Sequence, residues 1–421
     1  MRQNSARNAP LFSVLSNRAF RAIWYVGSLH EISRRMELLV LSWLILQTTN
    51  SPFLLLLVLV LNNVPRPFFS PFSGLIADRF SRLKIMIAAQ IINTAMSAVL
   101  FLLVFTDSIA SWHVFTAVLL SGITKSLEDP SRRTAILDIV GERRLVNALS
   151  LDTISNTSGK MIGPLVGGIL VDTTGFIGAF LVMLTFHLLT LLMLLRVRIP
   201  RVVRPLAAEP IWRSLGDGAR FALRHPLLWG MLYITIFMNA LAFPLQQFIP
   251  AIGRDNLQVG ATLVGLLVAG EGLGQLIGAS VMALTRNLRH HGRVFVIGSA
   301  VVLLMGILFV WTPWYSVAFL LLMLGGMGQS GFGTMQSTIT LLGTPVEMRG
   351  RMVGLMSFCI GLGWVASLEV GVVAELFGTQ MAITVNAALG LLLLLPAVLL
   401  TPLVRRPPAV VELAPEPESP R

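Results

Sequence analysis

Charged residues are scarce in this sequence of 421 residues. Asp, Glu, Lys and Arg together make up 12% of it, whereas about a quarter is usual for soluble domains. Apolar residues reach 55%, and the mean hydropathy is +0.78. A lipid bilayer accommodates such an excess, and each spanning helix needs about 20 mostly apolar residues. The composition therefore excludes a sizeable soluble domain and predicts many membrane spans.

Cysteine is nearly absent too. Cys359 stands alone, which excludes an intrachain disulfide and a metal site built on thiolates. The sequence also lacks a phosphate-binding loop, a metal-ligand cluster and a Ser/His/Asp set that could be placed together. We therefore expect no enzymatic activity, no cofactor and no metal. The energy for any work would come from an ion gradient or from the gradient of a substrate.

The apolar runs predict an all-α integral membrane protein with twelve transmembrane helices. Expected spans 1 to 6 lie near residues 20–47, 52–72, 85–105, 112–127, 147–171 and 176–195. Spans 7 to 12 are expected to begin near residues 226, 260, 294, 316, 352 and 379. Residues 1–17 are polar and basic, so the first span, and not a cleavable signal peptide, is expected to start insertion.

Two pseudo-repeated six-helix halves are expected, because weak identities recur at one spacing. Residues 122–134 align with 326–338 at an offset of 204, and Gly168 and Gly175 align with Gly371 and Gly378 at an offset of 203. Parallel repeats of this kind are typical of transporters. The expected parts are an N-terminal half (1–195), a cytoplasmic basic linker with a short amphipathic helix (196–225), a C-terminal half (226–400) and a disordered tail (401–421).

Basic residues gather on one side of the expected membrane. If the N-terminus is cytoplasmic, 26 of the 32 Lys and Arg residues fall on the cytoplasmic side and only Arg254 on the other. The remainder lie inside spans. The positive-inside rule then predicts that both termini are cytoplasmic, in a bacterial inner membrane. This placement explains the net charge of +12 without a nucleic-acid partner.

The connection between spans 2 and 3 reads Gly-Leu-Ile-Ala-Asp-Arg-Phe-Ser-Arg-Leu-Lys from position 74. It resembles the signature of the major facilitator superfamily, with Ser81 where a second Gly is usual. The resemblance implies a gating motif of Gly74, Asp78, Arg79 and Arg82. The Asp78 carboxylate is expected to face the N-terminal turn of span 11, which carries a partial positive charge. An ordinary basic loop is the alternative.

Span 5 carries closely spaced small residues and a proline: Gly159, Gly163, Pro164, Gly167 and Gly168. Small residues at this spacing let two helices touch along their backbones, and proline bends a helix. The pattern resembles the antiporter motif of the same superfamily, which implies export by exchange. Helix packing alone would need the same residues and remains the alternative.

Residues 43–52 and two matching amphipathic connections, 131–149 and 345–355, extend the resemblance over roughly residues 15–400. Together they resemble the branch of the superfamily that includes enterobactin exporters and putative drug efflux proteins. The resemblance implies a monomeric secondary transporter that exports a small organic molecule by alternating access, with protons as the expected coupling ion. Span 4 lacks the Arg-xx-Gln-Gly element of many proton-coupled relatives, so their coupling mechanism does not transfer directly.

Charges inside membrane spans are costly and mark function by default. The expected substrate and coupling residues are Glu31, Arg34, Arg35, Glu37, Arg66, Lys160 and Glu271. A self-neutralised structural network is the alternative. Lys125 also falls inside a span, Glu369 is a reserve candidate, and His187 is interpreted as a structural polar group.

The charge balance leaves three functions open. Four midspan cations against two carboxylates in the N-terminal half favour an anionic metabolite or siderophore as substrate, while a broad drug pump and a transporter-like sensor or scaffold are the other two. Glu271 lies among Gly270, Gly272 and Gln275 with no cation nearby on its own helix. Burial disfavours its charged form, so we expect Glu271 to carry the proton and the N-terminal cations to hold the substrate.

Overall fold

A computed structural model of the chain describes residues 11–66, 68–69, 81–141, 144–197, 211–285, 290–345 and 348–404. Three residues of the expected gating motif, Gly74, Asp78 and Arg79, lie outside the described residues, as do residues 198–210 of the linker and the tail beyond residue 404. Everything described is helix or short connection.

The six spans of the N-terminal half come from five helices. After the 3-10 turn η1 (Leu11–Ser16) follow α1 (Arg18–Thr49), α2 (Pro52–Asn63), α4 (Arg82–Phe105), α5 (Ser111–Val140) and α6 (Leu145–Arg196). Gly175 divides α6 into spans 5 and 6, because its φ of 70° interrupts the helix. Glycine adopts this left-handed backbone without a Cβ penalty.

The C-terminal half follows the amphipathic helix α7 (Ile211–Arg224), which confirms the short helix expected in the linker. Span 7 combines α8 (Pro226–Phe237), the π-helix η3 (Met238–Ala242), the 3-10 helix η4 (Phe243–Phe248) and α9 (Ile249–Asp255). The remaining spans are α10 (Ala261–Leu284), α11 (His291–Trp311), α12 (Tyr315–Leu342), the pair α13 (Arg349–Ala366) and α14 (Leu368–Phe377), and α15 (Thr379–Leu400).

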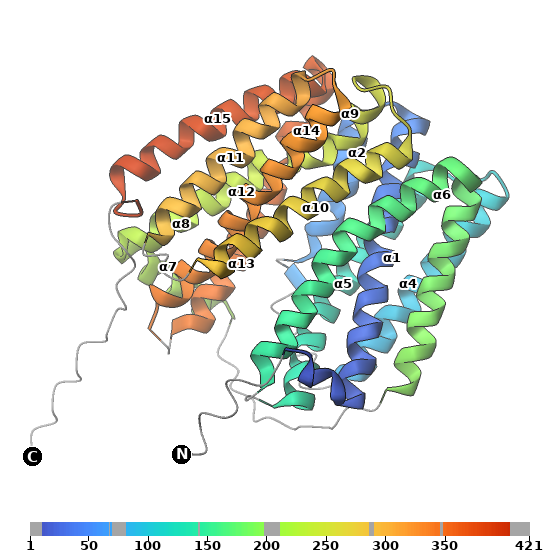
Figure 1. Ribbon diagram of the computed structural model, residues 1–421, viewed down its shortest axis with the longest axis horizontal. Coiled ribbons are helices and arrows are strands. Elements are labelled where there is room, and N and C mark those ends of the chain that lie inside the picture. The colour runs from blue at the N-terminus through green and yellow to red at the C-terminus, as the bar shows by residue number, and fades with distance from the viewer. Residues whose placement is uncertain are drawn as a thin grey trace, which may run out of the picture.

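Hydropathy and length mark eight of the described helical stretches as membrane spans, and α6 accounts for two spans by itself. The other three spans are α2, which is short, and α1 and α5, which carry several charges. The expected twelve-helix membrane fold is therefore confirmed, and Figure 1 shows its halves side by side, the first in blue and green and the second in yellow to red.

The internal repeat is visible as equivalent backbone contacts. A Cβ added at Gly122 of α5 would strike the carbonyl of Asn62 in α2, and one at Gly326 of α12 would strike the carbonyl of Glu271 in α10. Gly378 breaks spans 11 and 12 with a φ of 86°, as Gly175 breaks spans 5 and 6 with 70°. The aligned glycines thus perform the same task in both halves.

Hydrogen bonds join the halves at the face of the molecule where α1 ends. We call it the opposite face, because it lies opposite the face where α1 begins. The Asp172 carboxylate of α6 accepts from the backbone N–H groups of Ala261 (3.1 Å) and Thr262 (2.7 Å) at the start of α10. Arg254 of α9 donates to the Leu46 carbonyl (2.7 Å). Ser51, before α2, donates to Glu375 of α14 (2.7 Å). Helices α1, α2 and α6 are therefore tied to the C-terminal half at this face.

One expected boundary was wrong. Span 4 continues as α5 to Val140, where a connection was expected from residue 131. The charged end of α5 stays helical because Arg132 pairs with Asp152 (2.8 Å) and Asp138 pairs with Arg82. Two further features were not addressed by the sequence patterns: span 7 is broken by its π and 3-10 turns, and span 11 is divided at Ser367.

Candidate functional site

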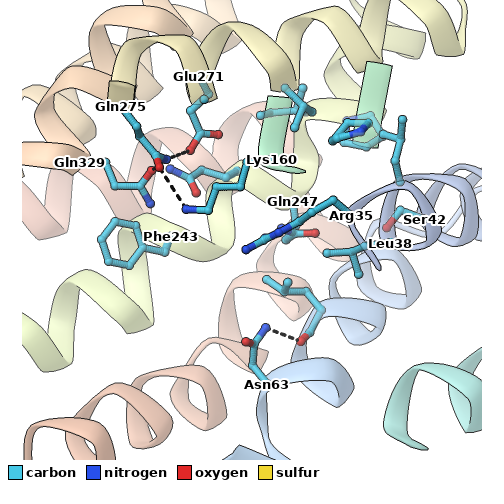
Figure 2. Close-up of a pocket in the computed structure, with 18 of the residues that line it drawn as sticks. Arg35, Leu38, Ser42, Asn63, Lys160, Phe243, Gln247, Glu271, Gln275 and Gln329 are labelled. Atoms are coloured by element: carbon cyan, nitrogen blue, oxygen red, sulfur yellow. Dashed lines mark hydrogen bonds between the residues drawn. The ribbon is translucent and has the colours of Figure 1, made fainter. Parts of the chain in front are cut away.

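A central cavity of about 320 Å³ lies between the two halves and is lined by α1, α2, α5, α6, span 7, α10, α12 and α13. Figure 2 shows Arg35 and Lys160 from the N-terminal half and Glu271, Gln275 and Gln329 from the C-terminal half around it. Its volume lies near the lower end of the roughly 300–1,000 Å³ usual for small-molecule sites. The cavity is therefore the place where a substrate could contact both halves at once.

Four of the seven expected substrate and coupling residues line this cavity: Arg35, Arg66, Lys160 and Glu271. The structure adds Lys125 of α5, a residue to which the sequence reasoning gave no role. Among the described lining residues, four cations face one carboxylate. In the part of the chain that the structure describes, no ion pair joins Arg66, Lys125 or Lys160 to a carboxylate. The described lining of the cavity therefore carries an excess of positive charge.

Lys160 connects the two halves across the cavity. Its ammonium donates to Gln275 Oε1 (3.0 Å), and Gln275 Nε2 donates to Glu271 Oε1 (3.0 Å). Gln275 Nε2 also contacts Gln329 Oε1. Figure 2 shows this polar group at one end of the cavity. Glu271 has no cation on its own helix, as expected, but Lys160 reaches it from the other half through one glutamine.

The irregular backbone of span 7 brings further polar groups into the cavity. Asn239 of η3 and Gln246 and Gln247 of η4 line it beside Phe243. Pro244 removes a backbone donor at this point, and π-turns inside helices are frequent at functional sites. The sequence reasoning missed these residues, although the run Pro-Leu-Gln-Gln from position 244, within an apolar span, was a visible signal.

The glycines of the expected packing motif let α6 approach two helices. A Cβ at Gly163 would lie 2.6 Å from the Ile32 carbonyl of α1, and one at Gly159 would lie 2.9 Å from the Cβ of Glu31. Gly167 faces Met36 in the same way. Gly168 instead meets the Ala261 carbonyl of α10, and the Pro164 carbonyl lies against Gly265 of α10. The motif therefore packs span 5 between α1 and the C-terminal half.

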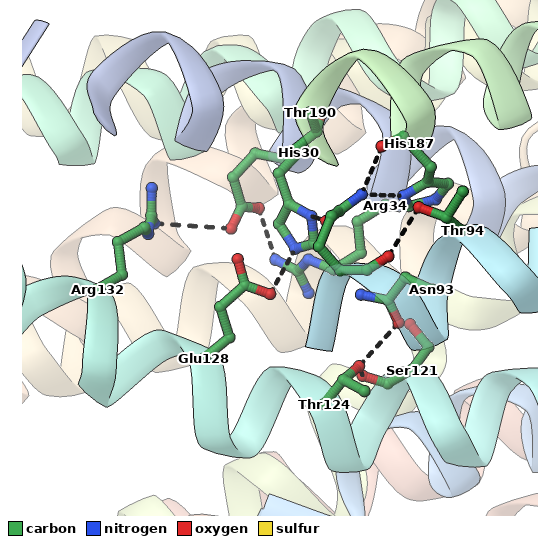
Figure 3. Close-up of polar contacts among 12 residues, drawn as sticks. His30, Arg34, Asn93, Thr94, Ser121, Thr124, Glu128, Arg132, His187 and Thr190 are labelled. Atoms are coloured by element: carbon green, nitrogen blue, oxygen red, sulfur yellow. Dashed lines mark hydrogen bonds and ion pairs between the residues drawn. The ribbon is translucent and has the colours of Figure 1, made fainter. Parts of the chain in front are cut away.

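Glu31 and Arg34 lie outside the central cavity. They belong to a buried group that we call the N-half cluster, whose members are His30, Glu31, Arg34, Glu128, Arg132 and Asp152. Arg34 donates to Glu31 (2.5 Å), and Arg132 lies 3.9 Å from Glu31. Figure 3 shows Arg34, Glu128 and Arg132 within this group. The contacts of these two residues are those that the alternative interpretation, a self-neutralised network, requires.

Glu37, the last of the seven, turns away from the central cavity. Its carboxylate lies 3.6 Å from His187 Nε2 of α6, and it lines a separate small pocket with Arg34. His187 therefore bonds neighbours, as its interpretation as a structural group requires. The sequence reasoning missed His30 and Glu128. The signal for Glu128 was the run of charges at positions 125, 128, 129 and 132, which repeats with the spacing of one helix face.

Only part of the expected gate can be placed. Arg82, at the start of α4, pairs with Asp138 of α5. Arg351, in the first turn of α13, lies 3.3 Å from Asp217 of α7. The contact of Asp78 with this turn stays a prediction.

The fold and the cavity define a multi-pass membrane transporter of the major facilitator type. A variant of the nucleoside transporter NupG matches with a TM-score of 0.76 and 12% identity over 90% of this chain and 99% of that chain. A bacterial homologue of the human lysosomal transporter Spinster, in an inward-facing and unoccupied conformation, matches with a TM-score of 0.67 and 16% identity over 93% and 96%. At these identities the likeness shows the fold alone.

The sequence profile of one family within this fold, described as transmembrane secretion effector, matches residues 9–416, so the chain belongs to that family. The enterobactin exporter EntS of Shigella flexneri is 27% identical over 289 residues, 67% of each chain. The same exporter of Escherichia coli O1:K1 / APEC is 26% identical over 289 residues, again 67% of each chain. The branch expected from the motifs is confirmed.

Proposed function

We propose that this protein is a secondary transporter that exports a small organic anion across the bacterial inner membrane by alternating access. The observation that carries the proposal is the central cavity, in which Arg35, Arg66, Lys125 and Lys160 face one carboxylate. Arg35 also lies 3.9 Å from Glu31, but no ion pair joins Arg66, Lys125 or Lys160 to a carboxylate among the described residues. Cations that face a cavity without a carboxylate partner favour an anionic ligand, and Arg and Lys bind carboxylate and phosphate groups well. The enterobactin exporters among the relatives support export as the direction.

The charge of the substrate decides the coupling. An anion that leaves a cell with a negative interior moves with the membrane potential, which supplies about 2.3 kcal/mol per charge per 100 mV. Protonation of Glu271 would favour binding of such an anion, because it neutralises the one carboxylate among the described residues that line the cavity. Export of a pure anion therefore needs no proton antiport.

Proton antiport is the second candidate, and the Glu271–Gln275–Gln329 group favours it. A substrate with a cationic or hydrogen-bond-donating group would compete with a proton for Glu271. Substrate and proton would then exclude each other, as exchange requires. In this case Glu271 is the proton carrier, as the sequence led us to expect.

Counterflow of labelled organic acids and zwitterions in proteoliposomes tests the proposal. For an anion, Lys160→Ala should weaken binding about 10- to 100-fold, since a hydrogen bond to a charged group contributes about 1.5–3 kcal/mol. Lys160→Arg, which keeps the charge, is the matched control. Unchanged affinity in Lys160→Ala would reject the anion site.

The variant Glu271→Gln separates the two candidates. Under anion export it should keep transport driven by membrane potential. Under proton antiport it should keep exchange but lose accumulation driven by a pH gradient alone. If compounds bind to the protein but none of them shows counterflow, the protein is instead a sensor or scaffold.

A further inference from the structure

Four helices of the N-terminal half meet at a row of buried polar side chains that lies apart from the central cavity. His30 comes from α1, Gln90 from α4, Glu128 from α5 and His187 from α6, and each is at most 6% exposed. None of these four residues is among those that line the central cavity. Figure 3 shows His30 between Glu128 and the neighbourhood of His187. These four side chains therefore lie outside the lining of the proposed substrate site.

The orientation of the Gln90 amide is set by its contacts with His187. Its nitrogen lies 2.9 Å from the His187 carbonyl oxygen and 3.1 Å from His187 Nδ1. A reversed amide would place an oxygen against that carbonyl oxygen, two acceptors at hydrogen-bond distance. Gln90 Nε2 therefore donates to His187, and Gln90 Oε1 is the atom that faces His30.

This orientation leaves His30 with two acceptors around its ring. Nδ1 lies 3.2 Å from Gln90 Oε1, and Nε2 lies 3.5 Å from Glu128 Oε2. A neutral imidazole carries one N–H and one bare nitrogen. If Nδ1 carries the proton, the bare Nε2 faces an ionised carboxylate. If Nε2 carries it, the bare Nδ1 faces the glutamine oxygen. Neither neutral tautomer satisfies both contacts.

One additional proton satisfies both contacts at once. It can sit on Glu128, which then donates to His30 Nε2, or on His30, which then donates from both nitrogens. Glu128 Oε2 is buried and accepts no hydrogen bond from the other described residues. A buried acceptor without a donor costs about 1–3 kcal/mol. The pair of His30 and Glu128 without the additional proton is therefore destabilised.

The charged neighbours do not supply the missing donor. On α1, Arg34 donates to Glu31 (2.5 Å), and on α5, Arg132 lies 2.8 Å from Asp152 of α6. Asp129, which follows Glu128 on α5, interacts with Arg34 and Lys125 through its charge. His187, at the other end of this group, needs no extra proton, because a neutral His187 that accepts at Nδ1 carries its proton on Nε2, which faces the Glu37 carboxylate at 3.6 Å.

We infer that His30 and Glu128 form a binding site for one proton, which holds α1, α4, α5 and α6 together and is separate from the substrate cavity. Loss of this proton sets two lone pairs against each other at the junction of four helices. The packing of the N-terminal half therefore responds to pH whether or not a substrate is present. This inference does not depend on which molecule the protein exports.

Infrared difference spectra of the purified protein between neutral and alkaline pH test the site without any substrate. With Glu271→Gln as the background, so that the cavity carboxylate gives no signal, the protein should lose one signal on alkalinisation, from a protonated carboxyl group or from an imidazolium ring. Glu128→Gln should lack this step, because a glutamine amide donates to His30 Nε2 without an added proton. Glu37→Gln is the matched control and should keep the step, because its partner His187 donates in the neutral form.

Thermal unfolding supplies the second readout. The folded wild type holds one proton more than the unfolded chain, so its stability should fall as pH rises through the step, and this slope should vanish in Glu128→Gln. His30→Gln should remove the same spectral step if Glu128→Gln does not fold. A step that persists in both variants, or that disappears in Glu37→Gln, overturns the inference. The infrared and unfolding measurements use no substrate, so they do not depend on the outcome of the counterflow experiment. Failure of the proposed transport is therefore distinguished from failure of the proton site.

Discussion

The central cavity and the N-half cluster hold similar side chains in opposite arrangements. In the cluster, arginines and carboxylates are interleaved: Arg132 lies between Asp152 (2.8 Å) and Glu31 (3.9 Å), and Glu31 also binds Arg34. In the cavity, Lys125 and Lys160 have no paired carboxylate among the described residues, and Lys160 rests on an uncharged glutamine. Buried charges that neutralise each other hold a structure together, whereas uncompensated charges facing an open volume are available to a ligand.

Two cations on one helix offer the strongest test of this comparison. Arg132→Leu leaves Asp152 without its partner, and removal of one member of a buried ion pair costs about 3–5 kcal/mol. We expect a large loss of yield and of melting temperature in detergent. Lys125→Leu, on the same helix but in the cavity, should change stability by no more than about 0.5 kcal/mol while impairing transport. Equal losses of stability in the two variants would contradict the distinction.

The boundary between the two regions runs along the contact of α6 with α1. A Cβ at Gly163 would lie 2.6 Å from the Ile32 carbonyl and 2.7 Å from the Cβ of Arg35, which lines the cavity. Gly163→Ala should therefore displace Arg35 and cost about 1–3 kcal/mol through overpacking. Melting temperature and counterflow of the purified protein measure both effects. Gly354→Ala, where a Cβ meets nothing within 4 Å, is the control and should behave as the wild type.

The smallest expected effect concerns the opposite face, where the two halves touch. The cavity depends on this contact because it lies between the halves, whereas the N-half cluster lies within one half. Asp172→Asn removes the charge that caps α10, worth about 0.3–1 kcal/mol. Opening at this face should become up to about fivefold more frequent. A cysteine at Ser42, introduced with Cys359 replaced by serine, should react faster with a polar thiol reagent. Asp107→Asn, an exposed carboxylate near the same face, should leave the rate unchanged.

The N-half cluster should be indifferent to this last change. Its members all belong to the N-terminal half, so parting of the halves leaves their contacts intact. The infrared step assigned to His30 and Glu128 should therefore be the same in Asp172→Asn as in the wild type. A changed step would show that the cluster and the cavity form one unit.

Sequence reasoning located the spans well because hydropathy and helix breakers are local properties. Span 1 was expected over 20–47 and α1 covers Arg18–Thr49; span 12 was expected from residue 379 and α15 begins at Thr379. It failed at α5, where charges were taken as the end of a span. Those charges stay helical because partners from α4 and α6 neutralise them, and the partners lie far away in the sequence.

The sequence predicted that intramembrane charges make up the candidate site, but not which of them line the cavity and which lie elsewhere. Seven intramembrane charges were expected to act together, yet the structure sends four to the cavity, two to the N-half cluster and one to His187. Glu31 and Arg35 are four residues apart on α1. Only the rotation of α1 against α5 and α6 decides that Glu31 meets Arg132, while Arg35, still 3.9 Å from Glu31, faces the cavity.

The sequence by itself determined the membrane class, the twelve spans, the repeat and the breaks at Gly175 and Gly378. These follow from the hydrophobicity of short segments and from backbone sterics, which need no knowledge of neighbours. The tertiary structure alone decided which charges are neutralised, which face the cavity, and that His30 meets both Gln90 and Glu128. The energy of a buried charge or hydrogen-bonding group depends on what lies within a few ångströms of it, and here those atoms come from helices distant in the chain.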